Sequence, residues 1–398
     1  MLIAGGGLVG LSLALLLSGA GMRIRLVDRL PFDNGALAAD ERHLALSEVS
    51  CRTLEALGVL QALGADAESI RGIHVSSAGE FGATRWDAAE RGFARFGMVA
   101  PARRLLEELR RKVSACTDVE MIAPATLAGV VASEQGITAD VVDASASVSL
   151  RARMLVIADG AESSLREAAG IGATRHDYGR SAVCCVVGTE RAHAGVAYER
   201  FTRSGPVAML PQPRSQSGSI LIVDTPRAAE LMAVSEREYL ARLQRAFGYR
   251  LGRLRQAGAR MSYPLRRVLA ERLTAPRQVL IGNAAQALHP VGAQGFNLGL
   301  RDAAALAERV LAAWRARADI GARGLLDEHA AARQSDRMAT AKLSHFLAQA
   351  TTLNSALAGW VRSAAMLAAD RFEPVAEHLV LAGMGFRGAT SAAARGIN

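Results

Sequence analysis

Cysteine is scarce in this chain of 398 residues, and its spacing excludes several kinds of site. The four cysteines are Cys51, Cys116, Cys184 and Cys185, and no two of them form a C-x-x-C pair. Zinc sites and dithiol redox centres need such pairs, or cysteine and histidine at comparable spacing. We therefore expect no metal site and no redox disulfide, but reduced thiols in a reducing compartment.

Long apolar runs and a leader-like start are also missing. The sequence has no stretch of 18 or more apolar residues, so nothing is expected to span a membrane. The first residues run from Met1 into glycines without a basic segment, which disfavours a secretory signal. The sequence thus predicts a cytoplasmic protein, with peripheral contact at the inner membrane face as the alternative.

Lysine is nearly absent, so the formal net charge of +9 comes from arginine. A basic excess is compatible with nucleic acid, an anionic membrane surface or an anionic cofactor. Aromatic residues make up only 5% of the chain, and no block of basic residues has aromatic residues interleaved with it. Nucleic acid is therefore not an expected partner.

Glycine, in contrast, is concentrated at the start of the chain. Residues 5–10 read Gly-Gly-Gly-Leu-Val-Gly, which is a G-x-G-x-x-G pattern. The apolar residues before it predict a buried strand, residues 8–20 predict a helix, and residues 23–27 predict a second strand. Together these segments predict a compact βαβ unit.

Each glycine of the pattern suits a dinucleotide site. Gly5 permits a tight turn, Gly7 lets the backbone approach a pyrophosphate, and Gly10 allows the helix and the strand to pack closely. Asp28 ends the second strand, 18 residues after Gly10, where a carboxylate can bind ribose hydroxyls. We interpret the unit as a dinucleotide-binding site; a merely structural Gly-rich turn is the alternative.

Two further motifs follow predicted strands. Residues 158–166 read Ala-Asp-Gly-Ala-Glu-Ser-Ser-Leu-Arg, a D-G-x-x-S-x-L-R pattern that is much rarer than an ordinary Asp-Gly turn. Residues 281–303 form a loop of small residues that leads into a helix expected from about residue 298. Small residues let a flat ring lie against the backbone, and a helix N-terminus stabilises negative charge on a reduced ring.

These three segments resemble the class A FAD-dependent aromatic hydroxylases, and within them the ubiquinone-biosynthesis subgroup. The resemblance rests on Gly-Asn-Ala-Ala-Gln-x-Leu-His-Pro and Gly-Phe-Asn-Leu-Gly-x-Arg-Asp in the third motif, and on residues 73–76 and 197–202. It implies an α/β fold like that of p-hydroxybenzoate hydroxylase: a Rossmann-like FAD-binding domain, an inserted β-sheet substrate domain and a C-terminal helical region. The implied boundaries are 1–70, 96–172 and 268–330 for the FAD-binding domain, 71–95 and 173–267 for the substrate domain, and 331–398 for the helical region.

The resemblance also implies which residues bind FAD. The glycines and Asp28 would hold the pyrophosphate and the adenosine ribose, and the third motif would hold the ribityl chain and the ring. Arg103 would touch the cofactor, and the adjacent Arg104 is the alternative residue for this contact. The implied cofactor-binding residues are Gly5, Gly7, Gly10, Asp28, Arg42, Arg103, Asp159, Asn283, Gly295, Phe296 and Asn297.

The activity that the resemblance implies is hydroxylation of a polyprenylated phenol by NAD(P)H and O2, through a flavin C4a-hydroperoxide. Such a reaction needs a base or a polarising donor at the phenol oxygen, and no residue of the sequence is identified for it. An FAD-dependent dehydrogenase and a non-catalytic scaffold among other quinone-biosynthesis proteins are the alternatives.

Two departures from the family pattern concern the third motif. Asn283 stands where the wider group has Asp, and an amide can still bond a ribityl hydroxyl. Ala293 stands where Gly is usual, and its Cβ would crowd a loop that needs a positive φ.

The C-terminal region carries apolar residues at helical spacing. They are Leu353, Leu357, Trp360, Val361, Ala364 and Leu367. Core packing is one explanation, and a surface that touches a membrane or a partner and admits a polyprenyl chain is the other.

Overall fold

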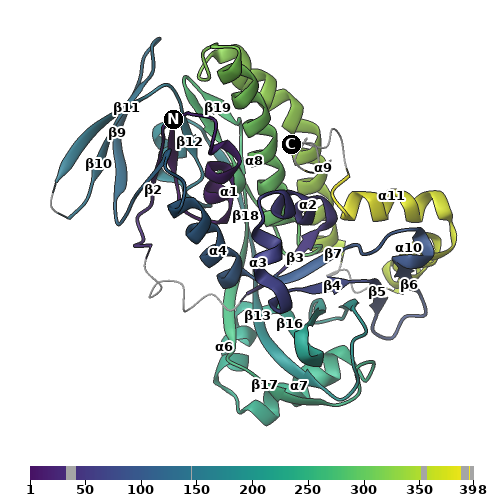
Figure 1. The fold of residues 1–398 in the computed structure, drawn as a ribbon. Helices are drawn as coiled ribbons and strands as arrows, with labels where there is room; N and C mark the ends of the chain where they lie inside the picture. Colours follow the sequence, from purple (N-terminus) through teal and green to yellow (C-terminus); the bar gives the residue numbers. More distant parts are fainter. Residues whose placement is uncertain (33–41, 145, 351–355, 387–393, 395–398) are drawn as a thin grey trace.

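The computed structural model describes residues 1–32, 42–144, 146–350, 356–386 and 394. Its central feature is a six-stranded sheet in which five neighbouring strands run parallel and one edge strand is antiparallel (Figure 1). In spatial order the strands are β19 (Thr274–Ala275), β20 (Gln278–Leu280), β12 (Leu155–Ile157), β1 (Leu2–Ala4), β2 (Ile24–Val27) and β8 (Val119–Ile122).

Helices cover this sheet because its strands are apolar on both faces. Residues of β1, β12 and β20 are all buried, as is usual for a central parallel strand. Helix α1 (Leu8–Leu17) packs against α4 (Ala102–Ser114) and α8 (Gln294–Arg315). The resulting core includes Ile3, Leu11, Leu105 and Leu300.

A nine-stranded sheet forms the lower part of the molecule in Figure 1. Its strands, in spatial order, are β21 (Gln286–Ala287), β18 (Met261–Ala270), β13 (Ala173–Thr189), β16 (Gln216–Asp224), β15 (Val207–Gln212), β14 (Val196–Phe201), β5 (Gly72–Ser77) and β6 (Ala83–Asp87), with β17 (Leu254–Ala257) paired to β13. The pairing of β14 with β5 is parallel and joins segments far apart in the sequence. Helices α6 (Thr225–Ala233) and α7 (Glu236–Phe247) accompany this sheet.

The remaining strands form two small sheets of three strands each. One consists of β3 (His43–Ser47), β7 (Gly97–Pro101) and β4 (Glu68–Ile70), and the other of β11 (Ser147–Ala152), β10 (Ile137–Val142) and β9 (Thr126–Ala132). The second of these projects from the body of the molecule (Figure 1). Helices α2 (Glu48–Ala56) and α3 (Val59–Leu63) are separated at Gly58, whose φ of +63° breaks the helix.

The C-terminal part is helical. Its helices are α9 (Arg323–Ala350), α10 (Ala356–Arg371) and α11 (Glu373–Gly383), whereas the short helix α5 (Ser164–Ala168) begins within the second motif. Helix α10 packs on β6 and on α11. Within the described ranges, no helix combines the length and the apolar character needed to cross a membrane.

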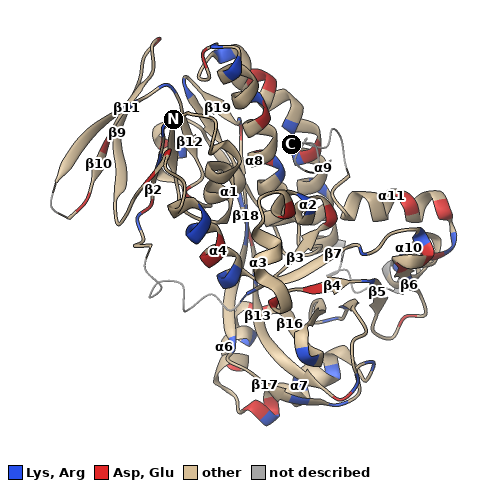
Figure 2. Ribbon diagram, viewed as in Figure 1, with Lys and Arg blue, Asp and Glu red and all other residues tan. Residues whose placement is uncertain are grey.

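Charged residues are distributed along the helices rather than gathered into one field. Figure 2 shows basic and acidic residues alternating along α4, where Arg104 pairs with Glu107 and Arg111 pairs with Glu108. Among the residues that the structure describes, no three or more His, Cys, Asp or Glu side chains lie together in a group that could hold a metal ion.

Candidate active site

The glycine loop between β1 and α1 has the shape that a dinucleotide needs. Gly5 has a φ of +110°, and a Cβ built on it would come 2.4 Å from the carbonyl oxygen of Ala158. A Cβ on Gly10 would come 2.0 Å from the carbonyl oxygen of Gly5. A Cβ on Gly7 would meet nothing within 4 Å, so the backbone there faces open space. Two glycines therefore close the turn, and the third leaves room beside the helix N-terminus for a phosphate.

Asp28 lies beside this loop. It follows β2, and its carboxylate accepts hydrogen bonds from the backbone N–H of Gly6 and, at 2.7 Å, of Leu30. These bonds fix the carboxylate beside the turn. A carboxylate has about four acceptor positions, so a ribose hydroxyl can still donate to it.

The second motif meets the glycine loop through Ala158. Asp159 follows β12, the strand that pairs with β1, and its Oδ1 atom is buried without a hydrogen-bond partner among the described residues. Burial raises the pKa of Asp159 above its ordinary value, partly offset by a hydrogen bond from Ser163. An unpaired buried oxygen is costly, and a hydroxyl or phosphate group of a bound dinucleotide would satisfy it.

The loop of the third motif ends at the N-terminus of α8, which begins at Gln294, four residues earlier than the sequence indicates. Ala293 is the N-cap residue with a φ of +51°, and no side chain caps the helix. Ala293 therefore adopts the left-handed conformation although its Cβ disfavours it, and the conformation costs some strain. The uncapped first turn leaves backbone N–H groups of residues such as Gly295 and Phe296 for a ligand. Asn283 is exposed, so its amide is accessible.

The side chain of Asn297 ties this helix to β3. Its Oδ1 atom accepts from the Ser47 N–H at 2.9 Å, and its Nδ2 atom donates to the Ala45 carbonyl at 2.9 Å and to the Ala293 carbonyl at 2.7 Å. Asn297 is buried, and these bonds use its amide group in holding the loop. What Asn297 can offer a cofactor is thus its backbone and the position of the loop.

The arginines expected near the cofactor lie where β3 and α4 begin. The carbonyl of Arg42 accepts from the Ala102 N–H at 2.8 Å, and its guanidinium lies 5.2 Å from the ring centre of Tyr263. Arg103 is exposed and has one long ion pair, 3.5 Å to Glu107, whereas Arg104 is held by Asp66 and Glu107 at 2.9 and 2.7 Å. Arg103 is therefore the less engaged of the two. The Asp40-Glu41 part of this segment lies outside the described residues.

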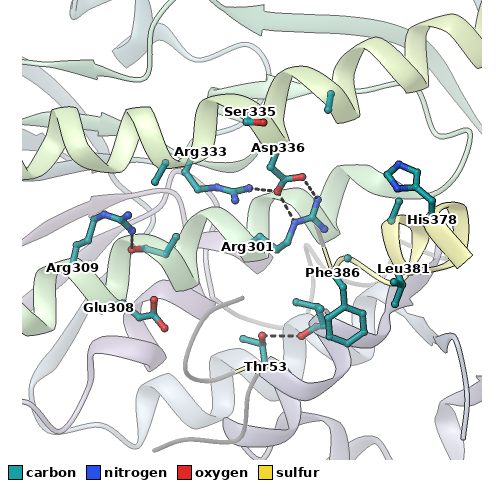
Figure 3. A pocket seen from close by; sticks show the side chains of 16 residues that line it. Thr53, Arg301, Glu308, Arg309, Arg333, Ser335, Asp336, His378, Leu381 and Phe386 are labelled. Carbon is teal, nitrogen blue, oxygen red and sulfur yellow. Dashed lines mark hydrogen bonds and ion pairs between the residues drawn. The ribbon is translucent and has the colours of Figure 1, made fainter. Parts of the chain in front are cut away.

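A buried network of charges joins α8 to α9, and no pattern in the sequence indicates it. Arg301 and Arg333 both bind the carboxylate of Asp336, at 2.9 and 2.7 Å (Figure 3). Arg333 also bonds Asp302 at 2.8 Å, and Gln286 donates to the same Asp302. The network lines a cavity of about 610 Å³ between α2, α8, α9 and α11, which does not include the glycine loop. Its visible role is to fix α8 behind the third motif.

A second cavity, of about 480 Å³, adjoins the third motif. Residues 290–294 and Asn297 form one part of its wall, and β3 contributes Ala45, Leu46 and Ser47. The other walls are the nine-stranded sheet and helices α9, α10 and α11. Apolar lining residues from these elements include Ile73, Val75, Phe201, Leu210, Ile220, Leu343, Met366 and Val380. The cavity is thus shaped for an apolar molecule beside the N-terminus of α8.

Comparison with known proteins agrees with this geometry. The family described as FAD binding domain matches residues 1–343. Ubiquinone hydroxylase UbiL of Rhodospirillum rubrum is 34% identical over 94% of this chain and 87% of its own length. The 3-demethoxyubiquinol 3-hydroxylase of Escherichia coli is 30% identical over 76% of this chain and 77% of its own length.

Solved structures agree in fold. The p-nitrophenol 4-monooxygenase PnpA of Pseudomonas putida has a TM-score of 0.80 at 19% identity, covering 97% of this chain and 98% of that one. Pseudomonas aeruginosa PqsL in complex with 2-aminobenzoylacetate has a TM-score of 0.77 at 23% identity, covering 91% and 98%. At these identities the likeness establishes the fold alone, and the predicted p-hydroxybenzoate hydroxylase-like class is confirmed.

The chain belongs to the FAD-binding domain family and is a flavoprotein monooxygenase of the aromatic-hydroxylase class. Its relatives within that class are the ubiquinone hydroxylases. FAD is its cofactor, and NAD(P)H is the co-substrate typical of the family. The open space at Gly7 and the unpaired oxygen of Asp159 fit such a cofactor.

Proposed function

We propose that the protein hydroxylates the aromatic ring of a polyprenylated phenol in ubiquinone biosynthesis, using NAD(P)H and O2. The observation that carries the proposal is the apolar cavity against residues 290–294, the loop that leads to the uncapped N-terminus of α8. The names of the relatives that share most of the chain's length support the choice of pathway. A methoxyphenol with its prenyl chain suits a cavity of this lining.

FAD, when bound, activates O2 for transfer to an electron-rich ring. The residues of this chain would bind and orient it. We propose that the adenosine end lies at Asp28, the pyrophosphate at Gly7, and the ribityl chain at Asp159 and Asn283. The same placement puts the ring against the backbone of residues 295–297, with Arg42 and Arg103 nearby. The helix N-terminus would then stabilise negative charge on the ring.

The cavity residues would exclude water and position the substrate ring. Exclusion matters because water in such a site diverts the activated oxygen. The cavity is too small for a ring and a long prenyl chain together, so the chain must leave it. Leu343 of α9 both lines the cavity and is exposed at the surface, so we propose that the prenyl chain leaves beside it.

The surface at this exit is apolar, and we propose that it rests on a lipid bilayer. Helix α10 turns Met366 and Ala369 towards the cavity and exposes Trp360 and Val361, at 66% and 61%, on its outer side. Phe81, from the turn between β5 and β6, contacts Trp360 edge to face at 5.2 Å between ring centres. A prenyl chain leaving the cavity would enter lipid without crossing water. Among the periodic residues of this region, Leu353 and the side chain of Leu357 lie outside the described part.

The test is genetic. A bacterium that lacks a quinone-ring hydroxylase should regain ubiquinone when it expresses this chain, and purified protein should be yellow. A colourless protein that stays colourless with added FAD contradicts the enzyme and supports a scaffold. A yellow protein that oxidises substrate without incorporating oxygen from labelled O2 supports a dehydrogenase instead.

A further inference from the structure

The sheet wall of the 480 Å³ cavity carries one carboxyl group. Side chains alternate along β14, so Ala197, Glu199 and Phe201 share the face that lines the cavity. Glu199 pairs in register with Val75 of β5 and Ala208 of β15, which line the same cavity and are apolar. Among the described residues that line the cavity, Glu199 is the only Asp, Glu, Lys, Arg or His.

The carboxyl group of Glu199 has no partner among the described residues. None of the hydrogen bonds or ion pairs between described residues involves its side chain, and the residue is half-buried and lines the cavity. Burial raises the pKa of Glu199 to about 7. Placing an unpaired carboxyl group in apolar surroundings destabilises a fold, so its position there calls for a ligand that can bond it.

The charged groups of the surrounding strands lie elsewhere. Arg85 of β6, Arg200 of β14 and Arg250 cluster around His74 of β5, on the opposite face of the sheet. Burial and these three arginines lower the pKa of His74 to about 4. Tyr198 also packs on that side, with its ring 5.5 Å from His74 and 5.6 Å from Phe247.

The described side chains of the helices bring no charge to Glu199 either. On α10, Arg362 pairs with Glu80, and Asp370 accepts from the Arg85 backbone N–H at 2.8 Å. On α11, His378 lines the neighbouring cavity. The described residues of α9 that line the apolar cavity are uncharged: Thr340, Leu343, Ser344 and Leu347. Ionisation of Glu199 is therefore controlled by burial and by what occupies the cavity.

We propose that Glu199 accepts the proton of the substrate's phenolic hydroxyl group. The O–H bond breaks, the proton passes to a carboxylate oxygen, and the bonding pair stays on the phenolic oxygen, which enriches the ring. A ring carbon then bonds one oxygen atom of O2, while the other leaves as water with the electrons of NAD(P)H. When that carbon loses its hydrogen as a proton, the phenolic oxygen recovers a proton from Glu199. This role rests on the proposed function.

The carboxyl group of Glu199 suits this step because burial brings its pKa close to neutral pH. A general base works best when its pKa lies near the operating pH, and glutamates in enzymes are commonly raised to that range by burial. An ordinary exposed glutamate would be a weaker base. Among the described lining residues, no second Asp, Glu, Lys, Arg or His competes with Glu199 for the proton.

The test compares Glu199→Gln and Glu199→Asp with wild type, and uses Glu190→Gln as the control. Glu190 belongs to the same part of the fold but pairs with Arg255 outside the cavity. Each protein is loaded with FAD and checked for colour and circular dichroism. The probes are a geranylated 2-methoxyphenol and its O-methyl ether, with binding measured by equilibrium dialysis and turnover as oxygen incorporation across pH.

Wild type and Glu190→Gln should bind the phenol more tightly than the ether above pH 7, by roughly tenfold, because a hydroxyl donates strongly to a carboxylate. Their kcat should rise through a pKa of about 7. Glu199→Gln should lose both the preference and the pH dependence, and its kcat should fall by about 10²-fold or more. Glu199→Asp should keep part of the binding preference and part of the pH dependence.

Two results would overturn the proposal, and they are distinguishable. If wild type hydroxylates the phenol and Glu199→Gln matches it in kcat, pH profile and binding preference, Glu199 is not the proton acceptor while the proposed function stands. If loaded wild type hydroxylates no prenylated phenol, the proposed function fails, and the role of Glu199 fails with it.

Discussion

The carbonyl oxygen of Gly5 occupies the place where a side chain on Gly10 would begin, since a Cβ there would lie 2.0 Å from it. Gly10→Ala must therefore push the backbone of the loop away from α1. We expect it to destabilise the protein by about 3 kcal/mol, as overpacking of a tight core contact does. Urea unfolding without FAD measures this loss, and unchanged stability would contradict the packing role of Gly10.

Gly7→Ala gives the matched comparison in the same loop. Gly7 has an extended backbone with φ of −80°, and its side-chain position is open, so the unloaded protein should keep its stability. A methyl group there would enter the space proposed for the pyrophosphate, so FAD affinity should fall by roughly tenfold or more. Fluorescence titration with FAD checks this. Undiminished affinity would remove Gly7 from the proposed site.

Asp336→Asn should show how much the buried network contributes. Burial alone would raise the pKa of Asp336, but Arg301 and Arg333 lower it below its ordinary value. The stabilisation is therefore present above the unfolded pKa of about 4 and is lost as pH falls through the folded pKa. Breaking such a pair typically costs about 3–5 kcal/mol.

The measurement is urea unfolding of wild type and Asp336→Asn at neutral pH and in acid. The variant should be weaker at neutral pH, and the difference should shrink in acid. Asp327→Asn is the control, because Asp327 pairs with Arg323 at 3.4 Å on the exposed side of α9. It should change stability little. A constant difference at all pH values would argue against the ion pair as the cause.

Ala293→Gly tests the strained start of α8. Glycine adopts a φ of +51° without the strain that Ala293 carries. Part of this gain is lost because glycine also raises the conformational entropy of the unfolded chain. We expect a net gain of about 0.5–1 kcal/mol by calorimetry. Ala305→Gly, inside the same helix, should instead lose about 1 kcal/mol. Destabilisation by Ala293→Gly would mean that its methyl group makes contacts that outweigh the strain.

The exposed side of α10 is tested with vesicles. The double variant Trp360→Ser and Val361→Ser should float with anionic phospholipid vesicles roughly tenfold less than wild type, because two large apolar side chains no longer enter the bilayer. Its thermal stability should hold. Tyr249→Ser is the control, since Tyr249 is 68% exposed and follows α7. Equal flotation of all three proteins would contradict the proposed membrane contact.

The parts of the site that lie within one local segment could be predicted from the sequence. The strand, the glycine loop and the helix of residues 2–17 follow from local pattern and lie close to their expected positions. The positive φ at Ala293 could be anticipated because loop shape depends on few neighbours. The division into a cofactor domain and a substrate domain stays a prediction.

What the sequence could not provide depends on contacts between distant segments. The alternation of β14 indicates that Glu199 shares a face with Phe201, but not that β5, β15 and α10 surround that face. Likewise Asn297 reads as part of a cofactor loop, while its amide is used on Ala45 and Ser47, some 250 residues away in sequence. Arginine and aspartate on α8 and α9 look like ordinary surface charges until the helices are packed.

The order of the strands in the parallel sheet sets the order of assembly. Four of its parallel strands, β8, β2, β1 and β12, lie in the first 157 residues, whereas β20 begins at Gln278. A ribosome delivers the chain from its amino end, so β12 remains an unpaired edge while all the strands from β13 to β18 emerge. The loop that completes the flavin site comes later still. Flavin can therefore bind only near the end of synthesis, once β20 and the loop that leads to α8 have emerged.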